Sequence, residues 1–278
     1  MARVAFVERT HLQHHHEVRG VEIGIPVRRT TNPGAGADIT FHQRRRRLRT
    51  TRVDPSVDNM LKITGEGRKA ALDMRLVDPT TAPLGETKTD LAVARIVKIW
   101  QATQSERCTQ LVFSDLSTPD PQRFNIYDDV RSKLISAGIP AGEIAFIHDA
   151  ETDTAKKLLF DAVNAGRVRV LIGSTEKMGA GTNVQRRLVA LHHLDAPWRP
   201  RDIEQREGRI LRQGNANKEV QIYRYVTEGS FDAYIWQTLE TKARFKASEA
   251  AASLFFRDDS RQNGLLRPPQ IESEPSRG

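Results

Sequence analysis

The sequence has very little cysteine and no long apolar segment, and both absences restrict its class. Its 278 residues contain a single cysteine, Cys108, which excludes an internal disulfide and any cysteine-rich zinc site. No stretch approaches the roughly 18 consecutive apolar residues of a membrane-spanning helix, and the first residues lack the layout of a secretory signal. We therefore expect a soluble, cytoplasmic protein with no metal site and no membrane partner.

Positive charge is concentrated in the first 52 residues. This segment contains 11 Arg, no Lys and 4 acidic residues, a net charge of +7 against +8 for the whole chain. It shows no persistent helical or strand period, so we predict that residues 1–52 form a mostly disordered basic arm. The arm either binds nucleic-acid phosphates or is only a solvated tail. The body of the chain is close to neutral.

The next segment, residues 53–84, is predicted to be a helical connector. Two short helical patterns, over 55–63 and 66–76, are separated by Gly65 and Gly67 and closed by Asp78 and Pro79. At the other end of the chain, residues 251–278 are polar and contain proline, and we predict a disordered tail there.

Between residues 85 and 250, helical and strand patterns alternate. Helices are expected over 91–100, 127–135, 154–164, 201–211 and from 231 towards 250, and strands over 110–113, 144–147, 168–172, 188–194 and 220–226. This alternation predicts an α/β fold with a parallel sheet flanked by helices. Ligands of such a sheet gather at the carboxyl ends of its strands.

Two arginines in the predicted helix over 201–211 and just after it form the first candidate site. On a helix, Gln205, Arg209 and Arg212 fall within about 60° of one another, and Gly208 removes side-chain bulk beside them. Paired guanidinium groups suit a phosphoryl group in transfer, because their planar forks meet phosphate oxygens in a bidentate fashion. The alternative is a solvated face on which neighbouring glutamates pair with the arginines.

A loop rich in glycine and hydroxyl groups follows the strand predicted over 168–172. It includes Ser174, Thr175, Gly179, Gly181 and Asn183. Backbone N–H groups and hydroxyls at the end of a strand can approach a phosphate closely, so the loop is a candidate for contacting a nucleotide or a nucleic-acid backbone. Tight turning is the alternative explanation for its glycines.

Taken together, these segments resemble motifs V and VI of Swi/Snf-like superfamily-two helicases. The matching positions run from the loop through the segment 195–200 to Gln205, Arg209, Arg212 and Gly214, and the segments 111–115 and 223–230 resemble motif IV and the strand after motif VI. The resemblance covers residues 85–250 and implies the second, C-terminal RecA-like lobe of such a motor. Met178, Arg199 and Asn215 depart from the remodeller pattern, and the chain is also similar to helicase segments fused to DNA methylases on bacterial mobile elements.

The resemblance implies a role for each matching residue. Arg209 and Arg212 would be arginine fingers for ATP and Mg²⁺, which a partner lobe would mainly hold. Gln205, Gly181 and Gly208 would belong to the same cleft. Trp198 is expected to pack in the core, as large aromatic side chains usually do. DNA-backbone contacts are implied for Ser114, Ser174, Thr175, Gly179 and Asn183.

The sequence contains neither a P-loop, G-x-x-x-x-G-K-[ST], nor an acidic pair on a strand to hold Mg²⁺. We therefore expect no ATP hydrolysis by this chain alone, and a P-loop lobe that lies in another chain or was lost by truncation. A non-catalytic DNA-binding module and an inactive helicase remnant are the alternatives. A nucleotide-dependent oxidoreductase is discounted, because no G-x-G-x-x-G joins a first strand to a helix.

Overall fold

A computed structural model of the chain describes residues 2–11, 20–23, 59–82, 86–178, 181–227 and 230–242. The chain divides into a large unit, Met1–Gln237, and a second unit, Thr238–Gly278. Residues 243–278, which include the tail predicted over 251–278, lie outside the described residues. The description below concerns the large unit.

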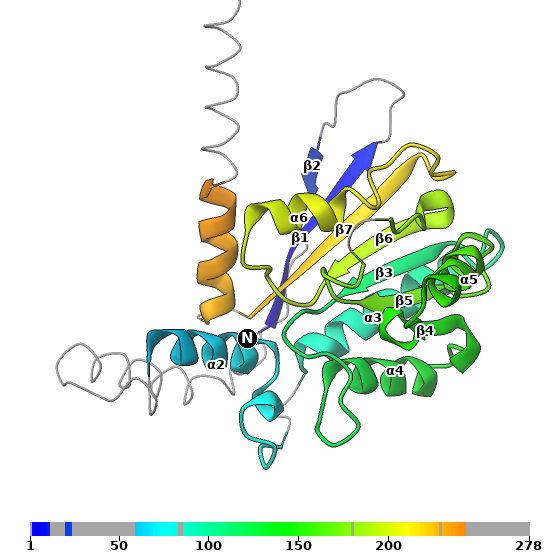
Figure 1. Cartoon of the computed structure of the whole chain (residues 1–278). Helices are drawn as coiled ribbons and strands as arrows, with labels where there is room; N and C mark the ends of the chain where they lie inside the picture. The colour runs from blue at the N-terminus through cyan, green and yellow to red at the C-terminus, as the bar shows by residue number, and fades with distance from the viewer. Residues whose placement is uncertain are drawn as a thin grey trace, which may run out of the picture. The chain divides into compact units, whose positions relative to one another are not determined.

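The centre of the unit is a seven-stranded sheet with the order β2-β1-β7-β6-β3-β5-β4 (Figure 1). Its last five strands in that order are mutually parallel, whereas β1 is antiparallel to both β7 and β2. The predicted α/β class, a parallel sheet flanked by helices, is therefore confirmed. The strands are β1 (Ala2–His11), β2 (Gly20–Ile23), β3 (Thr109–Phe113), β4 (Ile144–Phe146), β5 (Val170–Gly173), β6 (Leu188–His193) and β7 (Glu219–Thr227).

The helices begin at side chains suited to capping. Asn59, Thr87, Asn125 and Thr152 each accept a hydrogen bond from a backbone N–H in the first turn of the helix that follows. Within the described residues, no helix has the length and apolar character needed to cross a lipid bilayer. The helices are α2 (Met60–Leu72), α3 (Lys88–Ala102), α4 (Ile126–Ser136), α5 (Asp153–Asn164), α6 (Pro200–Glu207) and one over 231–242, with short 3₁₀ turns at η1 (Met74–Leu76), η2 (Ala141–Glu143), η3 (Ile147–Asp149) and η4 (Gln185–Arg187).

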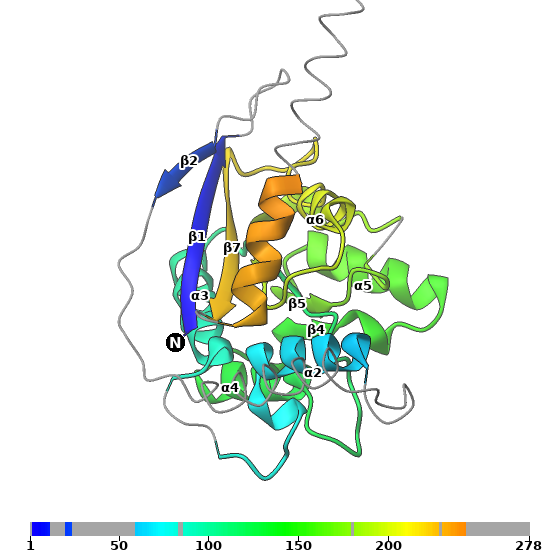
Figure 2. The same cartoon turned by 90° about the vertical axis from the view of Figure 1, so that its left-hand side faces the viewer.

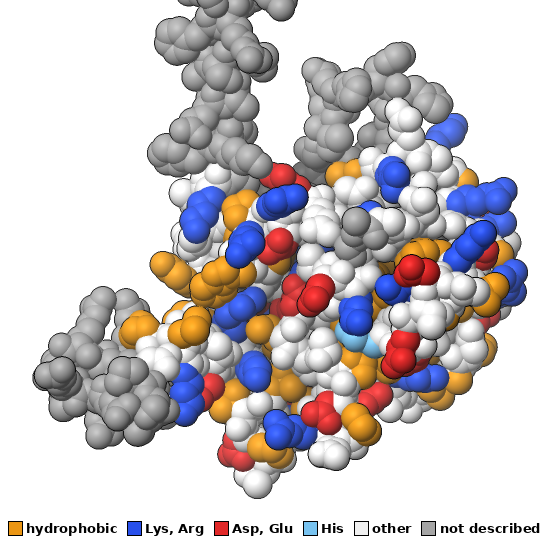
Figure 3. All heavy atoms as spheres, in the orientation of Figure 1, with side chains coloured by type: hydrophobic (Ala, Val, Ile, Leu, Met, Phe, Trp, Pro, Cys, Tyr) orange, Lys and Arg blue, Asp and Glu red, His pale blue; other side chains and the backbone are white. Residues whose placement is uncertain are grey.

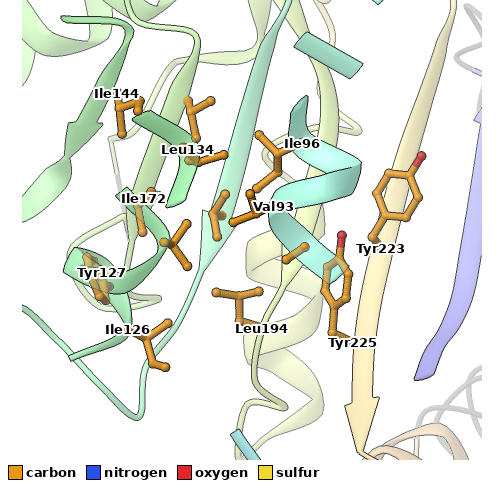
Figure 4. Close-up of a cluster of buried hydrophobic side chains, with 14 of the residues drawn as sticks. Val93, Ile96, Ile126, Tyr127, Leu134, Ile144, Ile172, Leu194, Tyr223 and Tyr225 are labelled. Carbon is orange, nitrogen blue, oxygen red and sulfur yellow. The ribbon is translucent and has the colours of Figure 1, made fainter. Parts of the chain in front are cut away.

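Both faces of the parallel strands are buried. Along β3, Val112 belongs to a cluster with the inner faces of α3 and α4, whereas Leu111 and Phe113 belong to a second cluster with α5. Figure 4 shows the first cluster, in which Val93 of α3 and Leu134 of α4 lie over the sheet. This two-sided burial explains why the strands have nearly continuous apolar sequences.

Most predicted elements of residues 85–250 are confirmed, because α3, α4, α5 and β3 to β7 fall on the expected patterns. Cys108 is 4% exposed and lies directly before β3, as expected for a small buried side chain.

The prediction of a disordered arm is wrong for residues 2–11 and 20–23. β1 pairs with β7 from Ala2 opposite Thr227 to His11 opposite Glu219, and β2 pairs with β1 (Figure 2). The physical reason is tertiary: β7 has an edge whose N–H and C=O groups are free to pair, and that edge stabilises a segment without a clear period of its own. The rest of residues 1–52, including the run of four arginines, lies outside the described residues.

The prediction of two connector helices split at glycines is also wrong. One helix, α2, continues through both Gly65 and Gly67. A Cβ atom at 67 would lie 2.8 Å from the Phe231 ring, whereas a Cβ at 65 would have nothing within 4 Å. Gly67 therefore permits close packing of α2 on the helix that begins at 231, and it does not end the helix.

A buried polar chain joins β3, β6 and β7. The amide nitrogen of Gln110 donates to Ile96 O, so its Oε1 accepts from His192 Nε2 at 3.0 Å. His192 Nδ1 then accepts from the Tyr225 hydroxyl at 2.9 Å, and Tyr223 stacks on the imidazole at 5.0 Å. Burial lowers the pKa of His192 to about 3, which keeps the ring neutral at pH 7.

The two glycines of α2 give a matched test of the packing. We predict that Gly65→Ala stabilises the chain by up to about 1 kcal/mol, because alanine favours a helix. Gly67→Ala should instead destabilise it by about 1–3 kcal/mol, because the new methyl group displaces the Phe231 ring. Urea unfolding of the full chain measures both, and equal effects of the two substitutions would contradict the packing argument.

The buried histidine predicts acid sensitivity. His192 has a folded-state pKa of about 3 against an ordinary value of 6.5, so the unfolded chain binds its proton more tightly. The free energy of unfolding therefore falls as the pH drops from about 6.5 towards 3. Protonation of His192 accounts for a loss of about 2 kcal/mol between pH 7 and pH 5. In His192→Gln, which keeps a donor for Gln110 and an acceptor for Tyr225, this part of the loss should vanish. Urea unfolding at both pH values tests this, and an identical loss in both proteins would refute it.

Candidate functional site

One buried guanidinium joins the ends of three neighbouring strands. Arg206, in the last turn of α6, is 1% exposed. Its Nε donates to Thr175 Oγ1 at 2.7 Å, and its Nη2 donates to Asp115 Oδ2 at 2.6 Å and Asp195 Oδ1 at 3.1 Å. Because Asp115, Thr175 and Asp195 follow β3, β5 and β6, Arg206 fixes α6 to the carboxyl edge of the sheet.

The Asp195 carboxylate organises the backbone after β3. Its Oδ2 accepts from the backbone N–H groups of Asp115 and Leu116 at 2.6 and 2.9 Å, and from the Ser114 hydroxyl at 3.2 Å. Burial raises the pKa of Asp195, and the nearby guanidinium of Arg206 opposes this shift. The Ser114 hydroxyl is therefore directed at Asp195, and its contact with nucleic acid stays a prediction.

The second carboxylate, Asp115, is bound by the loop after β5. It accepts from the Thr175 backbone N–H at 2.7 Å and from the Thr175 hydroxyl at 2.8 Å. Burial alone would raise the pKa of Asp115, but Arg206 and the two Thr175 donors outweigh burial and lower it. Asp115 is therefore an ionised carboxylate at neutral pH.

A buried histidine lies on the other side of the guanidinium. Arg206 Nη1 lies 3.2 Å from His193 Nδ1, and because arginine only donates, Nδ1 is the acceptor and Nε2 carries the proton. That nitrogen lies 3.2 Å from Glu207 Oε1, which also accepts from Arg224 at 2.8 Å. Burial lowers the pKa of His193 to about 4. Burial would raise the pKa of Glu207, but His193 and Arg224 lower it to about 2. Glu207 thus pairs with Arg224.

The predicted helix over 201–211 ends early. α6 stops at Glu207, where a Cβ on Gly208 would lie 2.9 Å from Glu204 O, and Leu211 N then donates to Glu207 O in a tight turn. Ile210, in this turn, is fully buried in the core cluster that contains Leu111 and Phe113. Gln205, Arg209 and Arg212 consequently do not share one helical face, and that part of the prediction is wrong.

The structure nevertheless brings both arginines to the loop after β5. Arg209 Nη1 donates to Thr182 O at 3.4 Å, and Arg212 Nη1 donates to Asn183 Oδ1 at 2.5 Å. Burial lowers the pKa of Arg209, and the charge of Arg212 adds to the shift. Arg209 and Gln205 are half-buried, whereas Arg212 is exposed. The two candidate segments therefore meet in space.

The remaining loop positions differ in exposure. The Ser174 side chain is buried and accepts from Lys177 N at 3.2 Å. Gly181 is exposed and has φ of +87°, a left-handed conformation that favours glycine. Gly179 lies outside the described residues. Ser174 supports the turn, and the half-buried Thr175 that follows it donates to Asp115.

Trp198 does not pack in the core, contrary to expectation. Its side chain is 53% exposed, and Arg68 of α2 lies over the ring at 5.0 Å while donating to Ala196 O at 2.7 Å. The residues just before it, Asp195 to Pro197, are buried instead. A cation–π contact with Arg68 therefore holds the indole at the surface.

The described residues suit a phosphate better than a metal ion. They contain no group of three or more His, Cys, Asp or Glu side chains that could hold a metal. Arg212 offers an exposed fork that could meet phosphate oxygens. The Arg212 guanidinium therefore suits a phosphate group.

Sequence reasoning missed Arg206, Asp115, Asp195 and His193 as parts of the site. A signal existed for Arg206, because it lies beside Gln205 inside the motif VI-like segment, and for Asp115, which closes the motif IV-like segment. Burial was the missing information, since an exposed and a buried arginine look alike in a sequence.

No protein-family model matches the chain. A segment of 78 residues is 40% identical to the Defense against restriction protein B of Escherichia phage P1, and the match spans 28% of this chain but 3% of that protein. Among solved structures, the C-terminal part of the Fun30 ATPase domain has 20% identity and a TM-score of 0.41, covering 55% of this chain and 45% of that one.

Two helicase structures are also similar. The Pyrococcus furiosus Hef helicase domain has 20% identity and a TM-score of 0.38, covering 56% of this chain and 28% of that chain. The DUF1998 helicase MrfA bound to DNA has 12% identity and a TM-score of 0.32, covering 42% and 16%. Structural similarity at these TM-scores does not identify a function for the chain.

Substitution of Arg206 tests how much its guanidinium contributes to the stability of the fold. We predict that Arg206→Ala destabilises the chain by about 3–5 kcal/mol, because it leaves Asp115 and Asp195 facing each other without the cation that is hydrogen-bonded to both. Arg201→Ala, which removes an exposed arginine of the same helix, should change the free energy of unfolding by less than about 0.5 kcal/mol. Urea unfolding measures both, and a loss below about 1 kcal/mol for Arg206→Ala would disprove the central role.

Proposed function

We propose that this chain is the second, RecA-like motor lobe of an ATP-dependent DNA helicase or translocase. In this role it supplies Arg209 and Arg212 to an ATP site whose P-loop lies on another lobe. One observation carries the proposal: the two arginines that follow α6 lie against the loop after β5, while Arg206 fixes α6 to the carboxyl edge of the sheet. Residues of motif V-like and motif VI-like segments thus form one site.

The chemistry of Arg212 supports phosphate recognition. Its acceptor, Asn183 Oδ1, is a neutral amide oxygen. A charge-assisted bond to a phosphate oxygen is stronger, so an incoming phosphoryl group can replace the amide. ATP bound with Mg²⁺ would supply the phosphoryl group, and the guanidinium groups would offset charge that develops on its oxygens.

The loop after β5 supports a role in DNA binding. Its N–H and hydroxyl groups begin at the carboxyl end of a parallel strand, where a phosphate can approach. Figure 3 shows that Lys and Arg side chains on the visible face alternate with Asp and Glu. Affinity would therefore come from particular donors of the loop more than from a broad basic field.

The phage relative, named for defence against restriction, supports an origin among mobile genetic elements.

The proposal predicts the behaviour of the two arginines in ATP hydrolysis. The purified chain alone should show no hydrolysis, with or without single- or double-stranded DNA. Addition of a purified P-loop lobe from a Swi/Snf-like motor should give DNA-stimulated turnover, and Arg209→Ala or Arg212→Ala should reduce it on the order of 10³-fold. Arg201→Ala, at an exposed site on α6, should leave turnover unchanged.

The outcomes separate the motor from its alternatives. Turnover by the chain alone would mean a complete ATP site that the proposal denies. Salt-sensitive DNA binding, with turnover in the mixture that neither arginine affects, would favour the non-catalytic DNA-binding module. Absence of both DNA binding and turnover would favour the inactive remnant.

A further inference from the structure

The donors around Asp115 are those that proteins use to bind phosphate. The carboxylate accepts from a backbone N–H and a hydroxyl of Thr175, at 2.7 and 2.8 Å, and from Arg206 Nη2 at 2.6 Å. Backbone N–H groups at strand ends, hydroxyls and guanidinium groups contact the phosphates of nucleic acids in the same way. The two carboxylate oxygens of Asp115 thus accept from the kinds of donor that bind phosphate oxygens.

Arg206 does not depend on Asp115 for its charge balance. Asp195, 1% exposed, keeps one carboxylate oxygen and one carbonyl on the guanidinium, at 3.1 and 2.9 Å. The Asp115 side chain is 30% exposed and therefore reaches solvent. Asp115 can move away without leaving the buried Arg206 guanidinium unpaired, whereas Asp195 cannot.

Departure of Asp115 would also make the local charge positive. The guanidinium groups of Arg206 and Arg68 both interact electrostatically with Asp115 and Asp195. With both carboxylates in place, the two charges of each sign balance. With Asp115 displaced, two cations face one carboxylate, and the position attracts an anion.

We propose that Asp115 is a built-in substitute for a DNA phosphate, which holds the Thr175 and Arg206 donors until the DNA backbone displaces it. This inference rests on the proposed DNA-binding function. It adds that the Asp115 carboxylate competes with the DNA phosphate for the same donors. Because Arg206 belongs to α6, the exchange of carboxylate for phosphate changes the contacts of the helix that precedes Arg209 and Arg212. DNA binding at the loop is thereby linked to the candidate ATP site.

The test is Asp115→Asn in the full chain. The amide keeps an acceptor for Thr175 N but removes the competing charge. Affinity for a fluorescein-labelled single-stranded DNA of about 16 nucleotides should rise about tenfold at low salt, and the slope of log K against log salt should steepen by about one. Asp153→Asn, at an exposed carboxylate on α5, changes the net charge equally and should have little effect.

Two further measurements identify the cause. A methylphosphonate oligonucleotide, which has no backbone charge, should show no gain with Asp115→Asn. Introduction of Asp115→Asn into a Thr175→Val background should also give less than the full gain, because one of the proposed phosphate donors is missing. Thermal unfolding shows whether each variant is folded.

The outcomes are distinct. Equal affinities for Asp115→Asn, Asp153→Asn and the parent chain, with all three binding DNA, would overturn this inference and leave the proposed function intact. Binding by none of them would overturn both. Binding by Asp115→Asn alone would support both, because it would show a phosphate site that the aspartate closes.

Discussion

The structure depends on the burial of one arginine between two carboxylates. Arg206 has no contact with solvent to lower the energy of its charge, so its position depends on hydrogen-bonded carboxylates, of which Asp195 is buried with it and Asp115 is partly exposed. Those carboxylates follow β6 and β3, and the Thr175 hydroxyl that completes the shell follows β5. Three strand ends and one helix are therefore joined by a single charge.

The same constraint explains how two roles can be separated within one short segment. Arg206 turns inward and serves structure, whereas Arg209 and Arg212 follow the end of α6 and reach the loop. Glu207 pairs with Arg224 and lies against the neutral His193, which removes it as a partner for the two later arginines. Arg206 and Glu207 therefore serve the fold, whereas Arg209 and Arg212 contact Thr182 and Asn183.

The sequence predicted elements whose cause is local and missed those whose cause is tertiary. α3 was predictable because its apolar spacing and its capping residue Thr87 lie in the segment itself. Beyond α6, Ile210 is buried in the core, and Gly67 of α2 packs against Phe231, which lies far along the chain. For the site, the spacing of residues predicted that the arginines meet the loop, but no spacing distinguishes a buried arginine from an exposed one.

The pairing of β1 with β7 has a consequence for the biosynthesis of the protein. Ala2 lies opposite Thr227, so β1 is synthesised long before the strand that pairs with it. During synthesis β1 has no edge to pair with, while β3 to β6 can already assemble around their helices. The sheet therefore gains its outer strands last, and for that interval the nascent chain presents an unpaired strand to chaperones or to other nascent chains.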